Sequence, residues 1–129
     1  MQKILVEISV AELLDKISIL SIKMSKIKNK NKNKLIKNEM NILNSYLKKN
    51  LKINKKIRNY QKLLLKVNLS LWNIEDNIRK KEKIKNFGNE FIDLARKVYI
   101  NNDKRSKIKL KINKYFGSNI VEVKSYSKY

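Results

Sequence analysis

The stretch LARKVYINNDKRSKIKLKINKY (residues 94–115) decides the fold, because one face of it repeats with the period of a helix. Steps of four and three residues keep this face turned toward a partner. The face comprises Leu94, Val98, Asn101, Arg105, Ile108, Ile112 and Tyr115. Most of these residues are apolar or aromatic, but Asn101 and Arg105 stand at core-type positions. Arg105 therefore needs an acidic partner, because an unpaired buried charge costs several kcal/mol.

The N-terminal half of the chain predicts two more helices. Residues 10–27 have regular four-three apolar spacing. They follow a capping box at residues 9–12, in which a serine hydroxyl caps the first turn and a glutamate reaches back. Residues 28–34 alternate lysine and asparagine without an apolar side chain, so we expect a solvated connection there. A second helix is expected to begin near Leu35, and its apolar phase is lost around residues 49–54.

The C-terminal half predicts two long helices. An apolar row between residues 53 and 78 keeps strict heptad steps and would span roughly 40 Å. A corner follows at residues 86–89. The last helix should run over residues 90–115 and end at Gly117, which suits a left-handed cap.

These patterns predict a mainly α fold, an antiparallel bundle of about four helices in a single domain over residues 1–129. The absence of proline and the presence of only two glycines favour long helices. Alternating residues at 3–8 and 120–123 predict two short strands, which would join the termini as a β clip. Heptads of this length also fit a coiled coil or a homodimer.

The composition excludes several classes of site. The chain has no cysteine and no histidine, which removes disulfides, iron–sulfur clusters and the usual zinc ligand sets. We therefore expect no metal and no cofactor. The N-terminus lacks signal-peptide features, and no stretch approaches the roughly 20 apolar residues of a membrane span. A cytoplasmic protein is expected.

The net charge of +21 has more than one interpretation. Lysine is accompanied by a great excess of asparagine and isoleucine, as expected where coding DNA is rich in A and T. The charge then reflects drift on a tolerant surface. A selected polyanion-binding surface and an anionic membrane surface are the alternatives. Nucleic acid is the less favoured partner, because arginine is the preferred residue for bidentate phosphate contacts and is rare here.

Polar side chains beside the apolar rows form a candidate site. Trp72, Glu75 and Arg79 share one helical face, with Asp76 beside them. We expect Glu75 or Asp76 to pair with Arg105. The candidate polar cluster comprises Asp15, Lys16, Lys23, Trp72, Glu75, Asp76, Arg79, Arg96, Tyr99, Asn102 and Arg105.

Two interpretations of this cluster stay open. Lys16, Arg79 or Arg96 would face a cleft and take an anion. Alternatively, the cluster is a structural network, with Trp72 at the core boundary and a surface ion pair beyond it.

A series of motifs extends over nearly the whole chain and resembles a family of small, functionally uncharacterised bacterial and phage proteins. The resemblance implies no activity, because none is established for that family. Its members are often encoded among genes for cell-surface polysaccharide assembly. This chain departs from the pattern in its Lys-Asn segment, its lysine-rich surface and Val123, where a second acid is expected. The motifs are VEIS (6–9), ELLDKISILSIK (12–23), Asn68, LWNIEDNIR (71–79), Leu94-Ala95-Arg96, Val98-Tyr99, Asn102-Asp103, Arg105, Gly117-Ser118, Val121-Glu122 and Lys124-Ser125-Tyr126.

Three functions are compatible with the sequence. The first is a non-enzymatic helical accessory or protein-interaction module, linked through the resemblance to surface-polysaccharide synthesis. The second is a small enzyme or binder that takes an anionic metabolite in a Lys/Arg/Glu cluster; whether it is an enzyme stays open. The third is charge-driven binding of nucleic acid.

Overall fold

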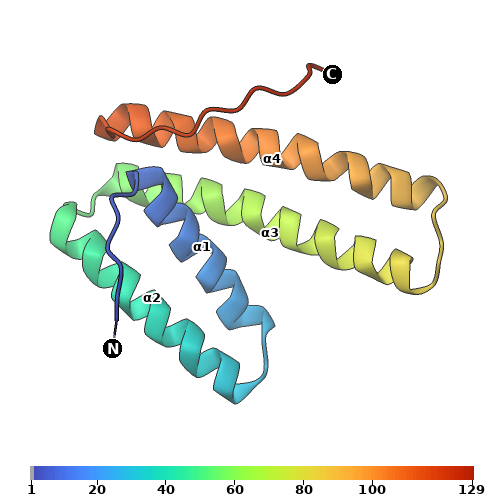
Figure 1. Cartoon of the computed structure of the whole chain (residues 1–129), viewed down its shortest axis with the longest axis horizontal. Helices are drawn as coiled ribbons and strands as arrows, with labels where there is room; N and C mark the ends of the chain where they lie inside the picture. Colours follow the sequence, from blue (N-terminus) through green and yellow to red (C-terminus); the bar gives the residue numbers. More distant parts are fainter. Residues whose placement is uncertain (1) are drawn as a thin grey trace.

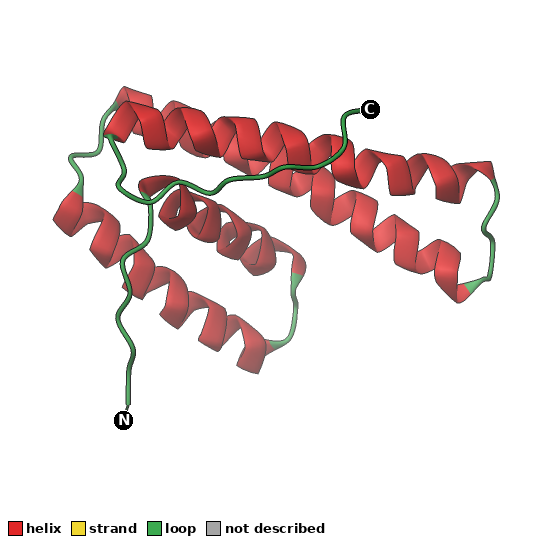
Figure 2. Cartoon of the chain, turned by 45° about the horizontal axis from the view of Figure 1, so that its top comes forward, coloured by secondary structure: helices red, strands yellow, loops and turns green. Residues whose placement is uncertain are grey.

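The computed structural model describes residues 2–129, which fold into four α-helices without a strand (Figures 1 and 2). The mainly α prediction is therefore confirmed, whereas residue 1 of the expected domain lies outside the described residues. Within the described range, no helix combines the length and apolar character that a bilayer crossing requires. The helices are α1 (Val10–Lys26), α2 (Lys30–Asn50), α3 (Lys55–Lys83) and α4 (Asn89–Phe116).

The helices form two hairpins of unequal length. Helices α1 and α2 make the short hairpin, and α3 and α4 make the long one (Figure 1). Helix α1 contacts all three other helices, whereas α2 contacts α1 alone. The α3–α4 hairpin extends well beyond the end of α1 in both views (Figures 1 and 2). As a result, one end of the molecule is only two helices thick.

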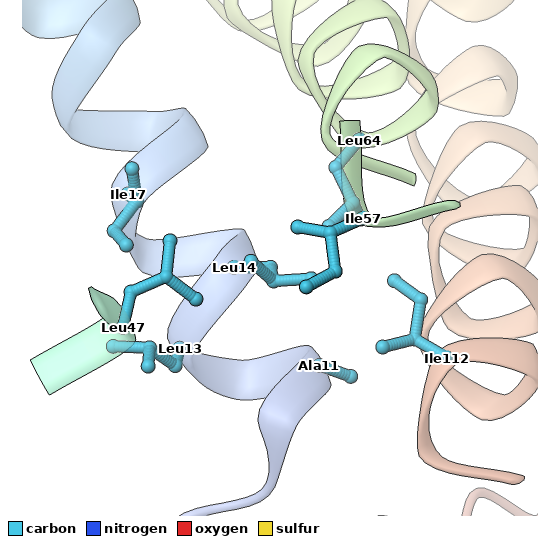
Figure 3. Close-up of a cluster of buried hydrophobic side chains, with 8 residues drawn as sticks. All are labelled: Ala11, Leu13, Leu14, Ile17, Leu47, Ile57, Leu64 and Ile112. Atoms are coloured by element: carbon cyan, nitrogen blue, oxygen red, sulfur yellow. The ribbon is translucent and has the colours of Figure 1, made fainter. Parts of the chain in front are cut away.

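The hydrophobic core lies where α1 crosses the long hairpin. Leu14 is fully buried and points toward Ile57 and Leu64 of α3, and Ala11 lies toward Ile112 of α4 (Figure 3). Leu47 brings α2 into the same cluster. Fully burying one such side chain contributes about 1.5–3 kcal/mol, so these few contacts fix α1 in place.

The first turn of α1 is held by the end of α4. The hydroxyl of Ser9 accepts a bond from the Glu12 amide at 3.1 Å, as the capping box predicts. The Ala11 amide donates to Asn113 Oδ1 at 3.0 Å. Helix α4 ends a few residues after Asn113 at Gly117, whose φ of 63° is left-handed. The predicted cap at Gly117 is confirmed. The Glu12 carboxylate lies 2.8 Å from Lys109 Nζ, so it serves a contact with α4.

The prediction of a solvated connection over residues 28–34 is wrong in most of its length. Helix α2 begins at Lys30 rather than near Leu35. The side chain of Asn29 caps it by accepting a bond from the Lys32 amide at 3.0 Å. Lysine is a good helix former and asparagine a preferred N-cap. Once Ile36 is buried against α1, a further exposed turn therefore forms without apolar residues of its own.

The expected β clip is not formed, since residues 3–8 and 120–123 are extended but unpaired. The N-terminal segment leaves the body, while the C-terminal tail (residues 118–129) follows α4 (Figures 1 and 2). Two strands without further packing are marginal in water. The tail instead contacts α4, where the Tyr129 hydroxyl donates to Asp103 at 2.6 Å.

Candidate functional site

A buried carboxylate joins three helices at the centre of the molecule. Asp15 of α1 is 1% exposed. It accepts bonds from both Nε and Nη2 of Arg105 on α4, the first at 3.1 Å. Asn68 of α3 donates to Asp15 Oδ1 at 2.8 Å and lies 3.2 Å from the hydroxyl of Ser18. Both carboxylate oxygens are therefore satisfied by a bidentate guanidinium and an amide, the geometry that makes charge-assisted bonds strong.

These contacts keep Asp15 ionised. Burial alone would raise the pKa of its carboxyl, but the bonds from Arg105 and Asn68 outweigh burial and hold the pKa below 3.8. The bond to Asp15 in turn raises the pKa of Arg105. Asp15 is thus a fixed anion and a poor proton donor.

Lys109 extends this charge network toward the C-terminal tail. Its side chain is 11% exposed, and its Nζ lies 2.8 Å from Glu12, 3.3 Å from Glu122 and 3.7 Å from Asp15. Burial lowers the pKa of Lys109, but the bond to Glu12 and the nearby acids more than reverse this effect and raise it. The bond from Lys109 lowers the pKa of Glu122 in the tail. The network therefore links the tail to the body.

A groove of about 440 Å³ opens beside the Asp15–Arg105 pair. This volume lies within the range of small-ligand sites. Helices α1, α3 and α4 all contribute, and the hydrophobic floor comes from α1 and α3. The lining residues are Ile19, Ile22, Asn68, Leu71, Trp72, Glu75, Asp76, Arg79, Asn102 and Arg105.

The rim of the groove is polar and open to exchange. Glu75 lies 3.8 Å from Arg79, and Asp76 lies 3.2 Å from Lys80, each pair one turn apart on exposed α3. Exposed pairs of this kind contribute at most about 1 kcal/mol. A ligand can therefore replace either ion-pair partner at a small cost in free energy.

Most of the predicted cluster meets at this groove. Asp15 lies beside it and binds Arg105, one of the lining residues. The predicted residues that line the groove are Trp72, Glu75, Asp76, Arg79, Asn102 and Arg105. The remaining members lie outside its lining. Lys16 is exposed and lies 3.8 Å from Glu12. Tyr99 packs edge-on against Tyr129 of the tail, with ring centroids 5.0 Å apart. Lys23 is half-buried, and Arg96 is exposed.

The predicted partner of Arg105 is wrong. The acid is Asp15 of α1 and not Glu75 or Asp76 of α3. The reason is packing: α1 packs against both long helices at this level and presents its own carboxylate to Arg105, whereas the two α3 acids pair along their own helix. The expectation that Arg105 needs a buried acid is confirmed.

The candidate cluster omitted five members of the network, although the resemblance motifs include all of them but Lys109: Glu12, Ser18, Asn68, Lys109 and Glu122. The helical register contains a signal for two of them. Ser18 follows Asp15 by three residues and Lys109 follows Arg105 by four, so each shares a face with a residue already selected. Asn68 follows Leu64 of the apolar row by one turn, and an asparagine at such a position needs a buried partner.

Comparison with known protein families, curated proteins and solved structures finds no match for this chain. Within residues 2–129, no group of three or more acidic side chains is arranged to hold a metal ion.

Proposed function

We propose that the protein is a non-catalytic binding module whose groove holds a small polyhydroxylated molecule, such as one sugar residue. The observation that carries this proposal is the composition of the groove. Trp72 lines it together with carboxylates, amides and guanidinium groups contributed by α3 and α4. An aromatic plane surrounded by hydrogen-bonding side chains fits a ligand that has one apolar face and a polar edge.

The polar groups of the groove match hydroxyls rather than a net charge. A hydroxyl both donates and accepts, and the groove offers acceptors on Glu75 and Asp76 and donors on Arg79 and Asn102. Arg105 adds a positive charge that Asp15 already balances. Arg79 pairs with Glu75, and Asp76 pairs with Lys80, so neither sign dominates.

The electrostatics support binding more than catalysis. Asp15 has a lowered pKa and is engaged on both oxygens, so it has no proton to give near neutrality. The chain also lacks histidine, the side chain best suited to proton transfer at that pH. The groove offers positioned polar groups without an evident general acid.

The alternative of an anionic metabolite has less support. Of Lys16, Arg79 and Arg96, which were expected to face the cleft, only Arg79 lines the groove, together with Arg105. Each of these two charges has an acid beside it, Glu75 for Arg79 and Asp15 for Arg105. A sugar ligand also accords with the resemblance described above, whose members are often encoded beside genes for surface-polysaccharide assembly.

Trp72 makes the proposal directly testable, because it is the single tryptophan of the chain. Tryptophan fluorescence should shift during titration with neutral hexoses or N-acetylhexosamines. Hexose phosphates and uronates serve as the anionic arm. The shift should disappear in Asp76→Ala and Asn102→Ala and persist in Asp93→Ala, which removes a carboxylate outside the groove. An unchanged spectrum with every sugar, or a response to the anions alone, contradicts the proposal.

Protein contact is the second candidate function, favoured by the apolar tip of the α3–α4 hairpin. Ile84, Phe87 and Ile92 are 66%, 50% and 51% exposed. Apolar side chains grouped on an exposed tip are typical of interaction sites. Light scattering after size exclusion should show self-association that Ile84→Ser with Phe87→Ser abolishes; a monomer at all concentrations rules out the homodimer and leaves a different protein as the partner to test.

A further inference from the structure

A row of four lysines runs along the back of α4, away from the groove. Lys104, Lys107, Lys111 and Lys114 follow one another by three, four and three residues and are all exposed. We refer to them as the α4 lysine row. Because an α-helix rises 1.5 Å per residue, the row covers about 15 Å on one face.

The row lies on the side of α4 opposite α1. Helix α4 contacts α1 through Arg105, Lys109 and Asn113, which bond to residues of α1. Lys107 and Lys111 stand two residues from Lys109, about 200° around the helix. Helix α2 does not contact α4, and the tail residues Val121 and Glu122 line a cavity together with Lys107 at the edge of this face.

The row forms no ion pair in the described part of the chain, although Asp103, which accepts a bond from Tyr129, precedes Lys107 by one helical turn. Within residues 2–129, none of its four ammonium groups takes part in an ion pair. The row is therefore a concentrated positive stripe on a straight support.

We infer that the α4 lysine row binds the phosphate backbone of double-stranded nucleic acid without reading its sequence. About 15 Å of duplex presents about four phosphates on one strand, at 3.4 Å per phosphate, and the row offers four ammonium groups over the same length. Neighbouring α3 adds Lys66 and Ser70 at exposed positions, two residues beyond the α1-facing Leu64 and Asn68. Lysine and serine are phosphate-contacting side chains.

The chemistry of the row separates this occupant from two others. Single-strand binders set several free aromatic side chains for base stacking, whereas the one exposed aromatic side chain that borders the row, Tyr115, packs edge-on against Tyr60 and Phe116. Surface helices that bind membranes set many bulky apolar residues beside their lysines, whereas between residues 104 and 114 Leu110 alone is an exposed large apolar side chain. The row also lacks arginine, the usual reader of guanine in the major groove, so contact is limited to the backbone.

The experiment compares two variants that lose the same amount of charge. In the row variant, Lys104, Lys107, Lys111 and Lys114 are each changed to Gln. In the control, four exposed and unpaired lysines of α2 are changed in the same way: Lys32→Gln, Lys34→Gln, Lys37→Gln and Lys48→Gln. Circular dichroism verifies that both remain helical. Binding to a fluorescein-labelled DNA duplex of random sequence is measured by anisotropy between about 50 and 200 mM salt.

The row variant should bind the duplex at least tenfold more weakly than the wild type, and the control less than threefold. The slope of log K against log salt should become shallower by about 3.6 in the row variant, because each phosphate contact contributes about 0.9. Equal losses in the two variants would assign binding to net charge alone and overturn the inference. So would a row variant that loses binding to phosphatidylserine vesicles but retains binding to DNA.

Discussion

Replacing Arg105 by methionine should lower the free energy of unfolding more than the removal of any surface charge. Arg105→Met keeps the volume and the apolar stem of the side chain but removes both bonds to Asp15. Asp15 remains 1% exposed, with the Asn68 amide and the distant Lys109 ammonium as its remaining partners. The variant therefore leaves a buried carboxylate that has lost its bidentate partner and keeps one hydrogen bond, from Asn68.

The expected loss is about 3 kcal/mol in the free energy of unfolding. Breaking a buried pair by removing one partner costs about 3–5 kcal/mol, and we take the lower end because Lys109 lies 3.7 Å from Asp15. The double variant Asp15→Leu with Arg105→Met removes both charges and should recover most of this loss. Arg79→Met is the matched control; its pair with Glu75 is exposed, and it should cost less than about 1 kcal/mol.

The loss should depend on pH with a defined sign. In the wild type the pKa of Asp15 lies below 3.8, so its contribution to stability is present above that pH and disappears as the pH falls through the lowered pKa. Without Arg105, burial becomes the dominant influence and raises the pKa of Asp15. The protein then protonates this group on acidification, and the difference between variant and wild type should shrink toward acid pH.

Urea denaturation followed by circular dichroism, repeated across a pH series, measures both quantities. A loss within about 1 kcal/mol of zero at neutral pH would refute the buried-pair reasoning, as would a loss that grows on acidification. Failure of the double variant to recover stability would show that Asp15 contributes through contacts other than Arg105.

Three further changes test the framework around the site. Asn113→Ala should cost about 1–3 kcal/mol, because the fully buried Ala11 amide loses its acceptor; a neutral result in thermal melts would contradict this role. Gly117→Ala should cost about 1–2 kcal/mol, since φ at this residue is 63° and open space around it excludes a clash as the cause; an unchanged urea midpoint would argue against backbone strain. Lys109→Met should lower the free energy of unfolding by about 2 kcal/mol, because Glu12 loses its bond at 2.8 Å. In a double-mutant cycle, the same substitution should cost less when Glu12→Gln is already present.

The sequence was sufficient to locate a helix end wherever an apolar row adjoined a distinctive cap residue. The start of α1 follows from its serine cap, and the end of α4 from Gly117. The start of α2 could not be found this way, because residues 30–34 carry no apolar signal and their helix depends on the burial of Ile36 against α1. Local pattern likewise predicted strands at both ends, but pairing requires a neighbouring sheet that this fold does not supply.

For the site, spacing identified the polar residues but not their partners. Periodicity places Arg105 on an inward face, and its need for an acid follows from electrostatics alone. Whether that acid comes from α1 or α3 depends on how these helices pack against α4, and no local spacing contains that information. The same limit explains why Asn68, although it belongs to the resemblance motifs, was not placed in the candidate cluster: its role appears only when Asp15 of another helix is beside it.

The bonds from α4 to the first turn of α1 change how that helix end opens. Helix ends usually fray, because their first amides lack partners within the helix. Here the amides of Val10 and Ala11 donate to Ser118 and Asn113, more than a hundred residues further along the chain. The buried Ala11 amide reaches solvent only when the contact between α1 and α4 opens, so its hydrogen exchange reports the separation of these two helices.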